Sequence, residues 1–215
     1  MTSPPSPMTA IELAKACEIL ASRDPDLART LDRLGPPPLW NRKPGFPTLV
    51  HIILEQQVSL ASARAAFDKL VAKTSPLQPA PFLELADPEL TKIGCSGQKG
   101  RYCRELAQAI LDGSLDPDVL GSLADDEVRA KLMKITGIGR WTADIYLLMA
   151  LGRPNVWPRG DLALHKAFQD LKGFEAPVSP SEFEELGEPW QPWRSVAARI
   201  LWNHYLNPPP SDPTP

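Results

Sequence analysis

Apolar residues recur at steps of three and four along most of the chain, which predicts amphipathic α-helices. The longest such pattern runs from Leu49 to Val71. Shorter ones cover Tyr102–Leu111, Glu127–Ile135, Thr142–Leu151, Leu162–Leu171 and Trp193–Leu206. No segment shows the alternation of β-branched and polar residues that is typical of a strand. We therefore expect an all-α fold.

Prolines mark where these helices end. The chain holds 25 prolines, and away from its two ends they gather in Gly35–Pro47, Ser75–Phe82 and Val178–Phe183. Proline lacks a backbone N–H and clashes with the preceding helical turn, so such clusters indicate connections. We expect one helical module over residues 8–206, with a disordered N-terminus over residues 1–7 and a disordered proline-rich tail over residues 207–215.

The composition is that of an ordinary globular protein, with 43% hydrophobic and 23% charged residues among 215. No apolar run reaches the roughly 18 residues of a membrane span, and the N-terminus lacks the features of an export signal. We expect a cytoplasmic monomer that does not associate with membranes. Its three cysteines lack the spacing of metal ligands, so neither a zinc site nor an iron–sulfur cluster is expected. The net charge of −3 argues only weakly against nucleic-acid binding, which depends on a local basic face.

The segment KITGIGRWTADIYLL (134–148) carries the first chemical signal, because Gly137 and Gly139 lie between two helical patterns. A dinucleotide-binding loop would need a third glycine where Thr142 stands, and a phosphate-binding P-loop would need Gly-Lys-Ser/Thr. Two interpretations remain open. The glycines form a sharp corner between core helices, or they form a hairpin whose backbone N–H groups, at the start of a helix at Arg140, grip a phosphate.

A second signal follows twenty residues after Trp141. Asp161 stands at the end of a Pro/Gly-containing loop, directly before the helix predicted to begin at Leu162. The simplest role for such an aspartate is to cap that helix. Capping does not exclude a chemical role, since a cap holds a carboxylate in a fixed place.

Together these motifs resemble a known family. ITGIGRWTADIYLLMALGRPNVWPRGD (135–161) is similar to the helix–hairpin–helix, Gly/Pro-rich loop and aspartate of the HhH-GPD superfamily of DNA glycosylases, and in particular to the bacterial 3-methyladenine DNA glycosylase II branch. The similarity extends to IILEQQVSLASA (52–63) and WQPWRSVAARILW (190–202). The resemblance implies a two-lobed all-helical fold, with a DNA-binding cleft between the lobes and the hairpin at its rim.

The resemblance also implies a set of site residues. Asp161 matches the catalytic aspartate of the family. The residues expected to line the base pocket are Trp141, Trp202, Ile145 and Tyr146. Those expected to bind DNA are Thr136, Gly137, Ile138, Gly139, Arg140, Gln57, Gln56 and Lys166, with Gln57, and after it Gln56, as candidates to fill the gap left by a flipped nucleotide. Main-chain carbonyls of Met133, Ile135 and Gly137 would hold a monovalent cation such as Na⁺ or K⁺, and no other cofactor is required.

Several of these residues have a purely structural alternative. The two glutamines would also satisfy buried backbone groups, the two tryptophans would also serve as core residues, and His165 and Lys166 would also form a solvated helix face. A further backbone contact is expected from Gln98, Lys99 and Arg101, which stand at the start of a predicted helix.

The chemistry of alkylated bases agrees with these assignments. A base inside a duplex must be flipped out before it can react. Alkylated purines carry positive charge, which the face of an indole attracts by roughly 0.5–2 kcal/mol. A nearby carboxylate stabilises the oxocarbenium-like sugar and orients the attacking water. The chain is therefore expected to act on damaged double-stranded DNA as a glycosylase of base excision repair, releasing alkylated purines such as 3-methyladenine and 7-methylguanine and leaving an abasic site.

Trp141 stands where strand-cleaving members of the family carry a lysine that forms a Schiff base, so no lyase activity is expected. The alternative to an enzyme is a non-catalytic helix–hairpin–helix module that recognises lesions or junctions, but such a binder gains nothing from Asp161. The chain also departs from the family pattern. No β-rich domain is expected before Phe46, Ile145 stands at the position of a pocket tyrosine, and Leu162 replaces an aromatic residue, so the preferred lesion stays open.

Overall fold

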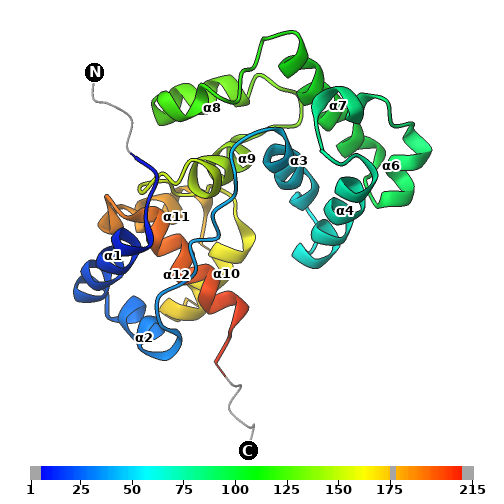
Figure 1. Cartoon of the computed structure of the whole chain (residues 1–215). Helices are drawn as coiled ribbons and strands as arrows, with labels where there is room; N and C mark the ends of the chain where they lie inside the picture. The colour runs from blue at the N-terminus through cyan, green and yellow to red at the C-terminus, as the bar shows by residue number, and fades with distance from the viewer. Residues whose placement is uncertain (1–5, 175–177, 210–215) are drawn as a thin grey trace, which may run out of the picture. The chain divides into compact units, whose positions relative to one another are not determined.

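The computed structural model of the chain describes residues 6–174 and 178–209, and every regular element in that part is helical (Figure 1). The predicted all-α fold is confirmed. The chain divides into two compact units, one built from Asn41–Leu151 and the other from the segment up to Trp40 together with the chain from Gly152 onward. Of the two predicted disordered segments, residues 1–5 and 210–215 lie outside the described residues.

Unit 1, as we call Asn41–Leu151, is organised around one apolar helix. Its helices are α3 (Phe46–Glu55), α4 (Leu60–Lys73), α5 (Pro79–Leu83), α6 (Asp87–Ile93), α7 (Gly97–Leu111), η1 (Leu120–Ser122), α8 (Asp125–Leu132), α9 (Arg140–Ile145) and the π-helix η2 (Tyr146–Ala150). Helix α3 is buried on nearly every side, and it packs against α4, α7 and α9. Continuous burial explains why its sequence is almost uniformly apolar rather than amphipathic.

The long pattern from Leu49 to Val71 is interrupted, so the prediction of one helix there is wrong. Helix α3 ends at Glu55, and Gln57 has a positive φ of 55° that no α-helix accommodates. Ser59 then caps α4 by accepting a hydrogen bond from the Ser62 backbone N–H. The apolar spacing continues across the break through Val58 on the turn and Leu60 at the start of α4, although both side chains are exposed, at 47% and 59%.

The segment predicted as one helix over Thr142–Leu151 is also divided. Helix α9 gives way at Tyr146 to the π-helix, whose wider turn is seen in the bond from the Leu151 N–H to the Tyr146 carbonyl. A π-turn inserts one residue into the helical register, which the three- and four-residue spacing of apolar positions does not reveal.

Unit 2 is assembled from both ends of the chain. Its helices are α1 (Ala10–Arg23), α2 (Pro25–Leu34), α10 (Leu162–Lys172), α11 (Pro180–Leu186), η3 (Glu188–Trp190) and α12 (Arg194–Leu206). The patterns above did not include α1 and α2. Helix α12 forms the core of the unit and packs against α1, α2 and α10.

Asp24 joins several elements of unit 2. It caps α2, and its carboxylate accepts hydrogen bonds from the Lys172 ammonium (2.8 Å) and from Nε1 of Trp190 (3.0 Å). Burial alone would raise the pKa of Asp24, but these donors hold it below its ordinary value. The ionised carboxylate therefore ties the N-terminal helices to the C-terminal part of the unit.

Candidate functional site

The two glycines of the hairpin between α8 and α9 have different structural roles. Gly137 has a φ of 87°, a left-handed conformation that favours glycine. A Cβ at this position would lie 2.0 Å from Cγ of Tyr102, so the ring of Tyr102 fills the space where a side chain would be. Gly139 has an ordinary φ of −91°, and a Cβ there would meet nothing within 4 Å. The fold therefore requires glycine at 137, whereas at 139 glycine leaves an open face.

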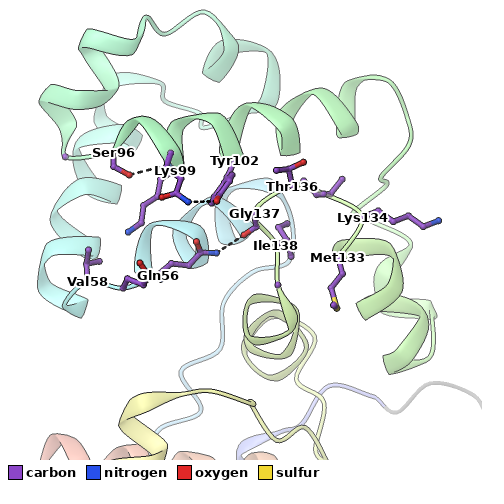
Figure 2. Close-up of a pocket in the computed structure, with 15 residues that line it drawn as sticks. Gln56, Val58, Ser96, Lys99, Tyr102, Met133, Lys134, Thr136, Gly137 and Ile138 are labelled. Atoms are coloured by element: carbon purple, nitrogen blue, oxygen red, sulfur yellow. Dashed lines mark hydrogen bonds between the residues drawn. The ribbon is translucent and has the colours of Figure 1, made fainter. Parts of the chain in front are cut away.

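The neighbouring amides Gln56 and Gln57 are separated by the structure. Nε2 of Gln56 donates to the Gly137 carbonyl and to Oγ1 of Thr142, both at 2.9 Å, and Figure 2 shows the first of these contacts. Gln56 thus holds the hairpin to the end of α3. Gln57 is exposed on the turn and has the positive φ noted above. Of the two, Gln57 is the side chain placed to reach a ligand.

A buried carboxylate fixes the geometry of the hairpin. Asp144, on α9, is fully buried and accepts hydrogen bonds from Nε of Arg129 (2.7 Å) and Nε of Arg140 (2.9 Å). Arg129 comes from α8, so this group ties the two helices together on either side of the turn. Arg140 was predicted to bind DNA; its side chain is 41% exposed while it pairs with Asp144. The sequence signal for this pair is the four-residue spacing of Arg140 and Asp144 on a helix.

The hairpin lines a cavity of about 730 Å³ within unit 1. Its other walls are the turn after α3 and the start of α7 (Figure 2), and its lining residues are Gln56, Gln57, Val58, Gly94, Ser96, Gln98, Lys99, Tyr102 and Met133–Gly139. This set contains two lysines and no carboxylate, although the whole chain is net negative. A cavity of this composition suits an anionic ligand.

The start of α7, predicted as a DNA contact, supplies part of this lining. Lys99 donates from Nζ to the Leu54 carbonyl at 2.7 Å, and burial lowers the pKa of its ammonium. Gln98 donates to the hydroxyl of Tyr102, the same ring that packs on Gly137. Arg101 is exposed and does not line the cavity.

In unit 2, Asp161 caps α10 as the sequence predicted. Its Oδ1 accepts hydrogen bonds from the Leu164 backbone N–H (2.9 Å) and from Nε1 of Trp202 (3.2 Å). The carboxylate is buried, and Trp202 is buried too, each at 8% exposure. The structure thus brings together two of the predicted site residues, the aspartate and one tryptophan. Leu162, directly after Asp161, is 84% exposed and leaves an apolar side chain beside the carboxylate.

The other three residues expected to line the base pocket differ in their burial. Trp141 is half-buried near the start of α9, in unit 1. Ile145 and Tyr146 are buried in the core of that unit, where the Tyr146 hydroxyl accepts a hydrogen bond from the Gly45 N–H at 3.1 Å. Burial raises the pKa of Tyr146 to about 12. Neither of these two side chains presents an exposed face to a ligand.

The helix face expected to be solvated holds one half-buried group, His165. Lys166 is exposed, and its Nζ lies 3.7 Å from Oδ1 of Asp170. His165 instead stacks on Phe183, with ring centroids 3.8 Å apart, and burial lowers the pKa of its imidazole. The expectation of a solvated face therefore fits Lys166 and is wrong for His165. Among the residues that the structure describes, no helix is long and apolar enough to cross a membrane.

Comparison with known proteins gives the family. The model of the HhH-GPD superfamily of base excision DNA repair proteins matches residues 50–192, which is more than half of the chain. The chain belongs to the HhH-GPD superfamily. The match includes the hairpin and Asp161, and it confirms the resemblance carried by these motifs.

Relatives of this HhH-GPD protein include 3-methyladenine glycosylases. It is 28% identical over 167 residues to a Bacillus subtilis protein provisionally named as a DNA-3-methyladenine glycosylase, and 29% identical over 191 residues to DNA-3-methyladenine glycosylase 2 of Escherichia coli. The matches cover 73% and 80% of this chain but only 58% and 63% of those relatives. The fold is like that of the Schizosaccharomyces pombe 3-methyladenine DNA glycosylase in complex with abasic DNA, at a TM-score of 0.85 and 23% identity, covering 94% of this chain and all of that one.

Proposed function

We propose that this HhH-GPD protein is a monofunctional DNA glycosylase that removes alkylated purines from double-stranded DNA, acting as a cytoplasmic monomer and leaving an abasic site. The observation that carries the proposal is the buried carboxylate of Asp161, which two N–H donors hold in one orientation. The activity named for its relatives supports 3-methyladenine and similar alkylated purines as the substrate class.

The hairpin and the residues that line its cavity are proposed to contact the DNA backbone. The open face of Gly139 lets a phosphate approach the backbone N–H groups of the turn without a side chain in the way. Lys99 and Lys134 line the same cavity and add positive charge. Such contacts bind any sequence, which suits an enzyme that must search for rare lesions.

The flipped base is proposed to meet the indole of Trp202, which bonds Asp161 and whose face favours a cationic purine over an uncharged one. Gln57 fills the space that the base leaves in the duplex, because its side chain is exposed whereas Gln56 is engaged with the hairpin. Leu162 contributes an apolar contact next to the reacting sugar.

Asp161 acts on the sugar. As the bond between C1′ and the purine nitrogen breaks, its electron pair leaves with the base and positive charge develops on the sugar. A carboxylate already oriented by Leu164 and Trp202 stabilises this charge without reorganising. Water then adds its oxygen to C1′, and the carboxylate accepts the proton that the water gives up.

Strand cleavage is not part of the proposed activity. A lyase needs an amine that attacks C1′ and forms a Schiff base, and the position that carries this lysine in the lyase members is Trp141 here. Treatment of the reaction with borohydride, which traps Schiff bases, should yield no covalent protein–DNA adduct. A trapped adduct would contradict this part of the proposal.

A monovalent cation is proposed at the main-chain carbonyls of Met133, Ile135 and Gly137. The Ile135 carbonyl already accepts the Ile138 N–H (3.0 Å), and the Gly137 carbonyl accepts Gln56. Each carbonyl oxygen keeps a second lone pair, so the set fits a weakly bound Na⁺ or K⁺ that would neutralise a DNA phosphate. Replacing K⁺ with choline at equal ionic strength should weaken DNA binding, and unchanged affinity would refute the site.

The test of the main proposal is release of methylpurines from methylated duplex DNA, measured by chromatography. Asp161→Asn should lower the rate by about 100-fold or more, while asparagine still caps α10 and keeps the fold. Asp170→Asn is the matched control, since that carboxylate lies exposed on the same helix. If the wild-type protein released no methylpurine, the alternative of a non-catalytic lesion-binding module would replace the proposal. If Asp161→Asn released methylpurine as fast as wild type, the proposed role of Asp161 would be wrong.

A further inference from the structure

Trp40 has an unusual backbone conformation for its side chain. Its φ is +48°, and among the residues the structure describes only Gln57 shares a positive φ without being glycine. The left-handed region is unfavourable for bulky side chains and persists only where surrounding contacts impose it. Glycine would adopt this conformation without strain. Contacts of the ring and of the neighbouring backbone must therefore hold Trp40 in this conformation.

Helix α12 holds this segment at two points. Nε of Arg199, a fully buried side chain, donates to the Leu39 carbonyl at 2.8 Å. Three residues later on the same helix, the indole of Trp202 meets the indole of Trp40 edge to face, with centroids 6.4 Å apart and planes inclined at 70°. This T-shaped arrangement is one of the favourable geometries for two aromatic rings.

The ring that Trp40 contacts is the one that binds Asp161. Nε1 of Trp202 donates to the carboxylate at 3.2 Å, and such a bond depends strongly on the direction in which the N–H points. An indole rotates as a rigid plate, so a contact with one part of the ring fixes the direction of its N–H. Trp40 supplies that contact.

We propose that Trp40 is a positioning residue for the glycosylase reaction, holding the indole of Trp202 in the orientation in which Nε1 donates to Asp161. The inference rests on the proposed function, since Asp161 must be the catalytic carboxylate. Trp40 lies in the proline-rich connection Gly35–Pro47, far in sequence from Asp161 and Trp202. Trp40 acts through Trp202 and does not itself need to touch the base.

The test uses Trp40→Gly, which removes the ring and also removes the backbone strain. We expect the urea unfolding midpoint to change little and the Kd for abasic DNA to change less than twofold. The single-turnover rate of base release should fall about tenfold. Trp40→Phe, which keeps an aromatic ring, should recover most of the rate. Phe174→Ala is the control, since it removes an exposed ring stacked on Phe168 in the same unit, and it should leave the rate unchanged.

A double-mutant cycle separates positioning from direct contact with the base. Trp202→Phe removes the N–H donor, so adding Trp40→Gly to it should lower the rate less than twofold further. An undiminished loss in the Trp202→Phe background would overturn the proposal, as would a wild-type rate in Trp40→Gly or a rate loss that only follows unfolding.

An independent measurement tests the contact without relying on activity. With 5-fluorotryptophan incorporated, the fluorine resonance of Trp202 should shift and broaden in Trp40→Gly, and an unmoved resonance would refute the positioning contact. If wild type released no methylpurine while this resonance moved, the proposed function would fail and the contact between the rings would stand.

Discussion

Replacement of Gly137 by alanine should destabilise the protein severely. A methyl group there would lie 2.0 Å from Cγ of Tyr102, so the ring must move. The left-handed φ of 87° adds about 1–2 kcal/mol for any residue with a Cβ, and displacing a packed ring costs about 1–3 kcal/mol. We expect the free energy of unfolding to fall by about 2–5 kcal/mol, measured by urea denaturation.

Gly139→Ala is the matched control, two residues away in the same turn. A Cβ there meets nothing, and the φ of −91° suits alanine. Loss of a glycine N-cap lowers the free energy of unfolding by less than about 1 kcal/mol. Alanine also reduces the conformational entropy of the unfolded chain, which stabilises the folded state by about 0.4–1 kcal/mol. The stability should therefore change little. The affinity for duplex DNA, measured by fluorescence anisotropy, should fall about tenfold because the methyl group would stand on the face proposed to receive a phosphate. This loss equals about 1.4 kcal/mol.

Combining Gly137→Ala with Tyr102→Ala separates the two causes of destabilisation. Relative to Tyr102→Ala alone, the added glycine substitution should cost only the backbone strain of about 1–2 kcal/mol. Equal unfolding midpoints for Gly137→Ala and Gly139→Ala would refute the argument that Tyr102 fills the space above Gly137. Wild-type DNA affinity in Gly139→Ala would show that the DNA backbone does not approach this face.

Three further outcomes are expected. Asp144→Ala leaves two guanidinium groups without their shared carboxylate and should cost about 3 kcal/mol in urea denaturation; a loss under 1 kcal/mol would contradict this. The pKa of Asp24 is lowered in the folded state, so its stabilisation is present above the unfolded-state value of about 4 and is lost as the pH falls through the folded-state pKa. Asp24→Asn should therefore flatten the decline of the unfolding midpoint below about pH 5, and an equally steep decline would disprove the assignment. Lys99→Gln should weaken DNA binding and reduce the salt slope by about 1, whereas Lys92→Gln, an exposed lysine outside the cavity lining, should not; equal effects would exclude a specific contact.

Features set by neighbouring residues could be predicted from the sequence. Asp161 was predicted as a helix cap because capping needs only a loop before a helix, and the structure confirms it. Most of the central helices follow from apolar spacing. The prediction failed at Gln57, because the apolar pattern continued through exposed residues and hid the turn.

Contacts between distant segments could not be predicted in this way. The sequence left Gln56 and Gln57 as alternatives, and local spacing could not show that Gln56 bonds Gly137, 81 residues away. Asp144 was not singled out, since its second arginine comes from another helix. Trp40 gave no signal at all, because neither its backbone conformation nor its contact with Trp202 is encoded by local spacing.

The division of the chain has a consequence for how the protein is made. Unit 1 is one uninterrupted stretch, and its two ends meet where the Arg42 N–H bonds the Met149 carbonyl at 2.9 Å. It can therefore fold as soon as the ribosome has released it. Unit 2 must wait for α12, which packs against α1 and α2 from the opposite end of the chain. A chain that ends before α12 would therefore carry the hairpin proposed to bind DNA but would lack Trp202, which donates to Asp161.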